Sequence, residues 1–100
     1  SDLNDSELKN YLQWIIPNAQ KNTMEPILLT LEQGGSTYPD NPHEGEEFGY
    51  VLKGSVEIHI GGKIYKAKKG ESFYYEAKYN HHIESKKGAT IIWVSSPPSF

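Results

Sequence analysis

A chain of 100 residues has the length of a single domain, and the absence of cysteine excludes disulfides, thiolate metal sites and cysteine nucleophiles. The 10 basic and 13 acidic residues give a formal net charge of −3, and the scatter of the basic residues argues against direct contact with nucleic acid. No apolar run approaches the roughly 20 residues of a membrane span, and the polar, acidic N-terminus does not resemble a signal peptide.

The segment 6–16 fits either a helix or a strand, and either element ends at Pro17. The residues with helical spacing are Leu8, Tyr11, Leu12 and Ile15, and those with strand alternation are Leu8, Leu12, Trp14 and Ile16. We favour a strand over 11–16, which makes residues 1–23 an N-terminal extension or an edge strand.

From residue 26 onward, short runs rich in β-forming residues alternate with glycine and proline turns. Residues 27–31 predict a strand, and residues 36–42, with their two prolines, predict a loop. Residues 48–52 predict a strand that Lys53 and Gly54 end. Residues 56–60 alternate between apolar and polar side chains, which predicts a further strand with one buried face.

The pair Gly61-Gly62 lies between two such runs and predicts a hairpin, because tight turns of this kind need a positive φ. Further strands are expected over 63–67, 72–75, 83–85 and 90–94. Eight or more short strands at spacings of about 8–12 residues predict an all-β sandwich or double-sheet barrel. A parallel α/β fold would need crossover helices, for which the sequence leaves no room.

His43 and Glu47 are four residues apart, so their side chains share one face if the segment is extended. Asn41 can share that face, and His81 can reach it if the sheet curls back, as in a small barrel. Two imidazoles and one carboxylate suit Fe(II), Mn, Ni or Zn and leave a coordination position for water or an anionic ligand. The spacing alone also fits an exposed acidic loop.

The other two histidines are expected away from this face. His59 alternates with the apolar Ile58 and Ile60, so it is predicted to face solvent. His82 follows His81 directly and therefore has the opposite strand parity.

Two stretches resemble the two motifs of the cupins, which are small barrels built as a double-stranded β-helix, or jelly roll. The first cupin motif reads His-x-His, three or four residues, Glu, six residues and Gly. Glu47 and Gly54 match it with six residues between them. His43 takes the place of the second histidine, and Asn41 takes the place of the first.

The second cupin motif reads Gly, five residues, Pro-x-Gly, two residues and His. Gly70 and His81 match it, whereas Glu76 and Lys78 replace the proline and the second glycine. Longer strings resemble the sensor half of helix-turn-helix–cupin transcriptional regulators, whose relatives include regulators of polyamine catabolism. These strings are residues 45–54, 69–75 and 93–100, and the resemblance covers most of residues 24–100.

This resemblance implies one cupin domain with its barrel over residues 24–100, a cytoplasmic location, a homodimer formed through the barrel, and a small-molecule effector inside it. It also implies DNA-binding helices N-terminal to the barrel. None is readable in this sequence, and the initial Ser1 suggests a fragment of a longer protein. The domain itself is then expected neither to contact DNA nor to catalyse a reaction.

The resemblance also implies which residues line the effector pocket: His43, Glu47 and His81, to which we add the aromatic Tyr75 and Trp93. The first three could instead hold a divalent metal (Zn, Ni, Fe or Mn), with Asn41 as a further, weaker oxygen ligand. Without a metal, the same side chains would bind the effector directly.

Two other functions stay open at this point. One is a small metal-dependent enzyme of the dioxygenase or isomerase type, and the other is a barrel that serves mainly for dimerisation. The sequence does not name an effector, although Glu46, Glu47 and Glu76 favour a cationic one.

Overall fold

The computed structural model describes residues 2–100, in which all regular elements are strands apart from one short 3₁₀-helix. The elements are β1 (Asp2–Asp5), β2 (Asn10–Trp14), the helix η1 (Ala19–Lys21), β3 (Glu25–Leu31), β4 (Glu46–Ile60), β5 (Lys63–Lys68), β6 (Ser72–Glu76), β7 (His81–Glu84) and β8 (Ala89–Ser96). The predicted all-β class is therefore confirmed, and the strands expected near residues 27, 63, 72, 83 and 90 all form.

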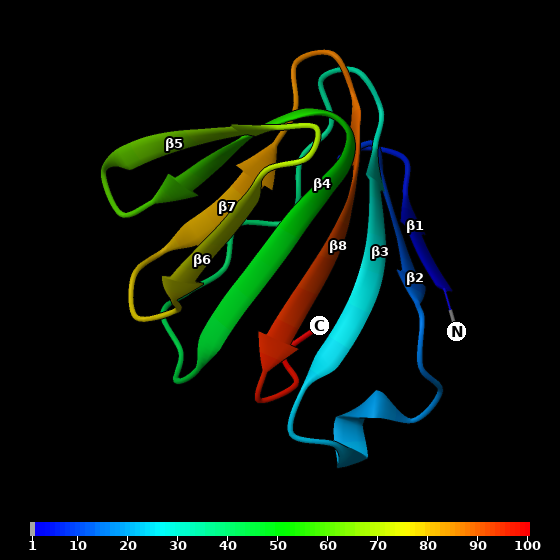
Figure 1. The fold of residues 1–100 in the computed structure, drawn as a ribbon, viewed down its shortest axis with the longest axis vertical. Coiled ribbons are helices and arrows are strands. Elements are labelled where there is room, and N and C mark those ends of the chain that lie inside the picture. Colours follow the sequence, from blue (N-terminus) through cyan, green and yellow to red (C-terminus); the bar gives the residue numbers. More distant parts are fainter. Residues whose placement is uncertain (1) are drawn as a thin grey trace.

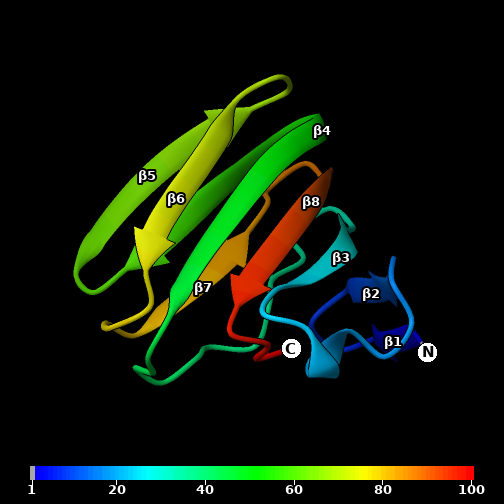
Figure 2. The same cartoon turned by 60° about the horizontal axis from the view of Figure 1, so that its bottom comes forward.

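The strands pair antiparallel in the order β1-β2-β3-β8-β4-β5, and β6 and β7 also pair with β4. The first part of β4 pairs with β6 and β8, whereas its last part pairs with β5 and β7. The sheet therefore folds over along β4 into two layers, with β3 and β8 in one and β5 and β7 in the other (Figures 1 and 2). This arrangement confirms the predicted jelly-roll barrel.

The predicted end of a strand at Lys53 and Gly54 is wrong, because β4 continues through both residues. Gly54 has a φ of +74°, and the register against β8 shifts between Val51 and Lys53, as in a β-bulge. A Cβ on Gly54 would lie 2.1 Å from the carbonyl oxygen of Gly88. The glycine therefore lets the strand bend from one layer into the other and is not a turn residue.

The N-terminal segment forms a hairpin at the edge of the larger layer. β2 confirms the strand prediction for residues 11–14 and excludes the helix, while residues 15 and 16 lie beyond the strand. β1 was not predicted, since its residues are all exposed and show no apolar alternation. The Asp5 carboxylate closes the turn by accepting hydrogen bonds from the backbone N–H groups of Glu7 and Leu8.

Inward-facing apolar side chains of both layers form the core, as strand alternation requires. They include Ile27, Leu29, Val51, Val56, Ile58, Ile83 and Ile91. The buried Glu25 fixes the C-terminus against this core: its carboxylate accepts hydrogen bonds from the backbone N–H groups of Ser99 and Phe100 and from the Trp14 indole. The Phe100 ring consequently packs on Trp93, with 4.4 Å between ring centroids.

Candidate functional site

Four side chains from three segments meet at one end of the barrel. Glu47 lies on β4 and points inward, and His81 is the first residue of β7. Asp40 and His43 belong to the loop before β4. Backbone hydrogen bonds in both directions between Asp40 and His81 hold that loop against β7, and the His43 N–H donates to the carbonyl of Ala77. These four residues are named the interior cluster below.

The ligand atoms of the interior cluster are close together. The Glu47 Oε2 atom lies 3.4 Å from His43 Nε2 and 3.3 Å from His81 Nε2. The Oδ2 atom of Asp40 lies 3.4 Å from the same His81 nitrogen. For a tetrahedral metal with bonds of about 2.0–2.1 Å, neighbouring ligand atoms are separated by roughly 3.3 Å, so these distances suit such an ion.

The hydrogen bonds around the interior cluster involve the Nδ1 atoms of its histidines and the Oε1 atom of Glu47, which point away from the centre of the cluster. The Nδ1 atoms of His43 and His81 lie 2.9 and 2.8 Å from the carbonyl oxygens of Glu44 and Tyr79. The Tyr75 hydroxyl donates to Glu47 Oε1. The two Nε2 atoms and Glu47 Oε2 are buried and have no hydrogen-bond partner among the described residues.

Buried polar atoms are rarely left unpaired, because each costs about 1–3 kcal/mol. Three such atoms that face one another form a set that a metal ion or a polar ligand would satisfy. Two imidazole nitrogens and carboxylate oxygens are a donor set for a divalent transition metal, and the carbonyl partners orient the imidazoles as in known metal sites. The residues present fit the divalent metal that the sequence left as one possibility.

The electrostatics of the interior cluster favour a positive charge at its centre. Burial disfavours the charged form of His81, but the carboxylates of Asp40 and Glu47 outweigh it and raise the pKa of His81 to about 10. Burial, followed by the Glu47 charge, raises the pKa of Tyr75 far above its usual range, so the phenol remains a donor. A proton on His81, a metal ion or a cationic ligand can each balance the carboxylates.

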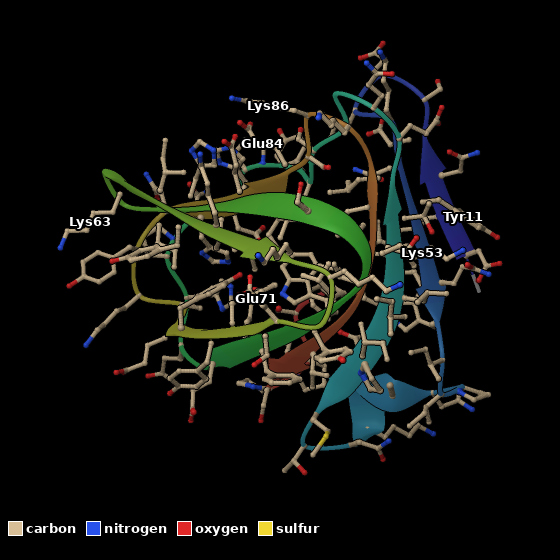
Figure 3. The ribbon with its side chains drawn as sticks, turned by 45° about the horizontal axis from the view of Figure 1, so that its top comes forward. Tyr11, Lys53, Lys63, Glu71, Glu84 and Lys86 are labelled. Atoms are coloured by element: carbon tan, nitrogen blue, oxygen red, sulfur yellow. The ribbon has the colours of Figure 1, made fainter. Side chains whose placement is uncertain are left out.

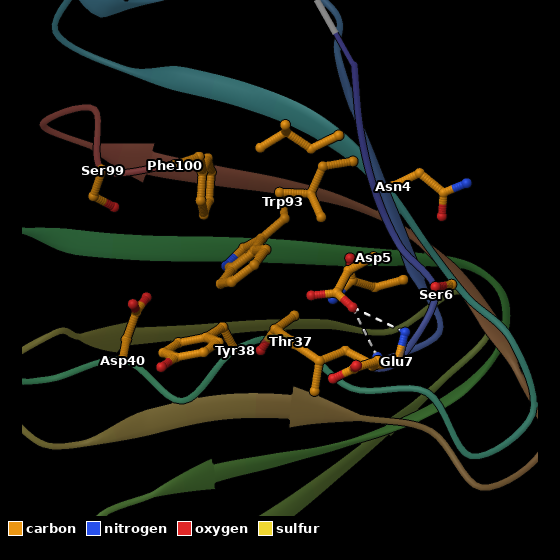
Figure 4. A pocket seen from close by; sticks show the side chains of 14 residues that line it. Asn4, Asp5, Ser6, Glu7, Thr37, Tyr38, Asp40, Trp93, Ser99 and Phe100 are labelled. Carbon is orange, nitrogen blue, oxygen red and sulfur yellow. Dashed lines mark hydrogen bonds between the residues drawn. The ribbon is translucent and has the colours of Figure 1, made fainter.

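A cavity of about 640 Å³ adjoins the interior cluster at Asp40. It lies between the β1–β2 hairpin and the barrel, and Figure 4 shows Trp93 and Phe100 on one wall and Asp40 near Tyr38. Among the described residues that line it, three are acidic (Asp5, Glu7 and Asp40) and none is lysine or arginine. Trp93, predicted to bind a ligand, lines this cavity, whereas Tyr75 contacts the site through its hydrogen bond to Glu47 and through its ring, whose centroid lies 5.3 Å from that of His81.

The structure thus brings His43, Glu47 and His81 together as the sequence suggested, and it adds a residue that the sequence missed. Asn41 is exposed, and the neighbouring Asp40 supplies the fourth donor, a carboxylate oxygen. Nothing in the sequence singled out Asp40, because its position depends on the pairing of a loop with β7. Glu46 and Glu76, expected to favour a cationic ligand, are exposed, and so their charges lie outside the interior cluster.

The sequence matches the family model described as "Cupin domain" over residues 27–95. No curated protein matches it. In the described part of the chain, there is no helix with the length and apolar composition needed to cross a membrane.

Solved structures share the fold at low sequence identity. An HTH_3 family transcriptional regulator from Vibrio cholerae has a TM-score of 0.79 at 17% identity over 91% of this chain and 52% of that chain, so this chain spans about half of that regulator. The Cupin_2 domain of an XRE family transcriptional regulator from Enterobacter cloacae has a TM-score of 0.78 at 15% identity over 91% and 99%. KdgF from a Halomonas species has a TM-score of 0.77 at 17% identity over 95% and 84%.

Proposed function

The chain belongs to the cupin family, and we propose that it is the small-molecule-sensing domain of a transcription regulator whose DNA-binding part lies outside these residues. One observation carries this proposal. The interior cluster, with its buried atoms that lack hydrogen-bond partners among the described residues, adjoins the cavity, and Asp40 belongs to both. The similarity of the fold to cupin domains from two regulators supports it. A regulator of this kind works in the cytoplasm, where its DNA is.

The lining of the cavity favours a small organic cation as the effector. Asp5, Glu7 and Asp40 give the cavity a negative potential that no lysine or arginine of the lining offsets. The aromatic faces of Trp93 and Phe100 attract cations through their ring electrons, an interaction worth about 0.5–2 kcal/mol. An amine can therefore satisfy both the carboxylates and the aromatic wall.

The position of the cavity offers a path from effector to regulation. One wall is the turn between β1 and β2, which precedes the barrel in sequence, and the opposite wall includes Asp40 and Trp93. A ligand that contacts both walls stabilises one placement of the hairpin relative to the barrel. In this proposal the hairpin transmits that change to the segment before it, because binding energy that differs between two arrangements shifts their populations.

A metal in the interior cluster would be held by His43, Glu47 and His81, with Asp40 as a fourth donor. Bound there, a divalent ion would act as a Lewis acid that attracts an anionic or neutral oxygen of a ligand. Tyr75 orients Glu47 through its hydroxyl, and the backbone carbonyls of Glu44 and Tyr79 orient the two imidazoles. The protein would lose a proton from His81 when the ion binds.

We also propose that the domain forms a homodimer through the outer face of the larger layer. Exposed apolar residues alternate along β4 (Phe48, Tyr50 and Leu52), and Tyr74 lies beside Phe48 on β6. A patch of this kind on one sheet face can pair with its own copy about a two-fold axis. Sedimentation analysis of Phe48→Ser should show a monomer, whereas Ile64→Ser, an exposed apolar residue on β5, should leave the dimer intact.

A thermal unfolding series tests the effector pocket directly. We expect an alkyl diamine to raise Tm by roughly 10–20 °C at about 100 times its Kd, since binding then adds about 2.7 kcal/mol. A diol and a dicarboxylate of equal chain length should have little effect. Asp40→Asn should abolish the shift, and Glu44→Gln, an exposed carboxylate of the same loop, should retain it. Equal shifts with all three compounds, or none with any, would count against the proposal.

A metal-dependent enzyme is the second candidate, because an ion held by His43, Glu47 and His81 alone would keep a fourth position for a substrate. The two functions differ in the fate of the bound molecule. A sensor returns its ligand unchanged after dissociation, whereas an enzyme loaded with metal returns a different compound. Mass analysis of the ligand after prolonged incubation with the protein separates them.

A further inference from the structure

A second group of metal-binding side chains lies on the opposite face of the layer that carries His81. It consists of His59 on β4 with His82 and Glu84 on β7, and it is named the outer cluster. His59 pairs with His82 in the β4–β7 ladder, so their side chains project from the same face. Figure 3 shows Glu84 and Lys86 on the outside of the barrel.

The three side chains converge on one carboxylate. The Glu84 oxygens lie 3.0 Å from His59 Nε2 and 3.3 Å from His82 Nε2. The two imidazole rings stack with centroids 4.3 Å apart and planes inclined by 16°. The two Glu84 contacts match the roughly 3.3 Å that separates neighbouring ligands of a tetrahedral ion, and all three ligand atoms lie within 4.8 Å of one another.

The outer cluster is held by its backbone and is open to solvent. Its residues lie within two hydrogen-bonded strands, so no loop has to become ordered for the ligands to meet. Their side chains are 22%, 27% and 37% exposed, which lets an ion enter and keep water at its free positions. The Nε2 atom of His59 is nevertheless covered and has no hydrogen-bond partner among the described residues.

We propose that the outer cluster is a separate binding site for a divalent transition ion that prefers imidazole, with Zn²⁺ as the simplest case. Two imidazoles with one carboxylate select Zn²⁺, Cu²⁺ or Ni²⁺ over Ca²⁺ or Mg²⁺, which need more oxygen ligands. The ion lies between strands that both border the barrel interior, because His81 and His82 are neighbours on β7. It therefore cross-links β4 and β7 directly behind the interior cluster.

Zn²⁺ titration followed by two-bond ¹H–¹⁵N spectra of the four histidine rings tests this site. We expect the Nε2 signals of His59 and His82 to shift together and to saturate with one ion. Glu84→Gln keeps the size of the side chain but removes its charge, and we expect it to weaken the affinity seen at these two rings about 10–100-fold. Unchanged ring signals at saturating Zn²⁺ would overturn the proposal.

Two control variants test whether the Zn²⁺ response comes from the outer cluster. Glu71→Gln removes an exposed carboxylate elsewhere on the surface, labelled apart from Glu84 in Figure 3, and should leave the affinity unchanged. His82→Ala should abolish the shift of His59 while the His43 signal still responds to the ion. If Glu84→Gln binds Zn²⁺ at His59 as tightly as the natural sequence, the histidines bind singly as surface residues and no built site exists. Circular dichroism confirms that each variant is folded.

Discussion

The adjacent residues His81 and His82 belong to two clusters with the same donor chemistry and opposite surroundings. In the interior cluster, the side chains of His81 and Glu47 are at most 1% exposed, and in the outer cluster Glu84 is 37% exposed. Burial makes charges expensive to leave unpaired, whereas solvent screens the same charges at the surface. Comparing the two clusters therefore separates the effect of the ligand types, which both share, from the effect of burial, in which they differ.

The two clusters should differ most in how much the free energy of unfolding falls when the central carboxylate is removed. Glu47→Ala deprives the buried imidazole of His81 of one of its two carboxylate partners, the one that is itself buried, and should lower the free energy of unfolding by about 3–5 kcal/mol. Chemical denaturation of protein kept in a chelator measures this. A loss below about 1 kcal/mol would mean that the interior charges are solvated.

Stability should also depend on pH through His81. The pKa of His81 rises from 6.5 to about 10 on folding, so its protonation stabilises the fold fully below pH 6.5. That stabilisation is lost as the pH rises through about 10. In metal-free protein the free energy of unfolding should therefore fall between pH 6.5 and 10. His81→Gln should flatten this slope, and a slope that survives the substitution must come from another group.

A smaller effect is expected at Tyr75, which contacts the interior cluster and not the outer one. Tyr75→Phe removes the hydrogen bond to Glu47 and should cost about 1–3 kcal/mol of stability. It should also weaken Zn²⁺ binding at the His43 ring about 10–100-fold, because it frees the orientation of a ligand. The outer cluster should keep its affinity in this variant, and a parallel loss there would couple the two sites.

The smallest effect is expected at the surface. Glu84→Ala breaks two contacts with half-buried imidazoles, and exposed ion pairs of this kind contribute about 0–1 kcal/mol. Denaturation in a chelator should therefore hardly distinguish this variant from the natural sequence. A loss comparable with that of Glu47→Ala would remove the contrast between the clusters.

Alternation along the strands made most of the fold predictable from the sequence. The runs from Ile27, Ser72 and Thr90 formed strands close to their expected bounds, because their inward residues had one core to bury. The misreading at Gly54 has a physical cause. A glycine with positive φ occurs in turns and in bulges alike. The pairing of Gly54 with β8 shows that it belongs to a bulge, and the sequence does not reveal this pairing.

The clusters were predictable only in part, for a related reason. Motif spacing indicated His43, Glu47 and His81, although His43 reaches the site from the loop before β4 and not from a strand. Asp40 was not indicated, because a backbone pairing of its loop with β7 brings it to the site. The outward direction of His59 also followed from parity, but its contact with Glu84 depends on the register between two strands distant in sequence.

Native mass spectrometry of the Glu84→Gln protein, in which binding at the outer cluster is expected to be weakened about 10–100-fold, tests the central claim that the interior cluster holds a ligand. After incubation with Zn²⁺ or an alkyl diamine, this variant should carry one bound ion or one diamine per protomer. Adding His43→Ala, a half-buried ligand at the rim of the cluster, should abolish the bound ion and leave the fold intact. Equal Zn²⁺ occupancy in both proteins, or no bound species in either, would contradict the account.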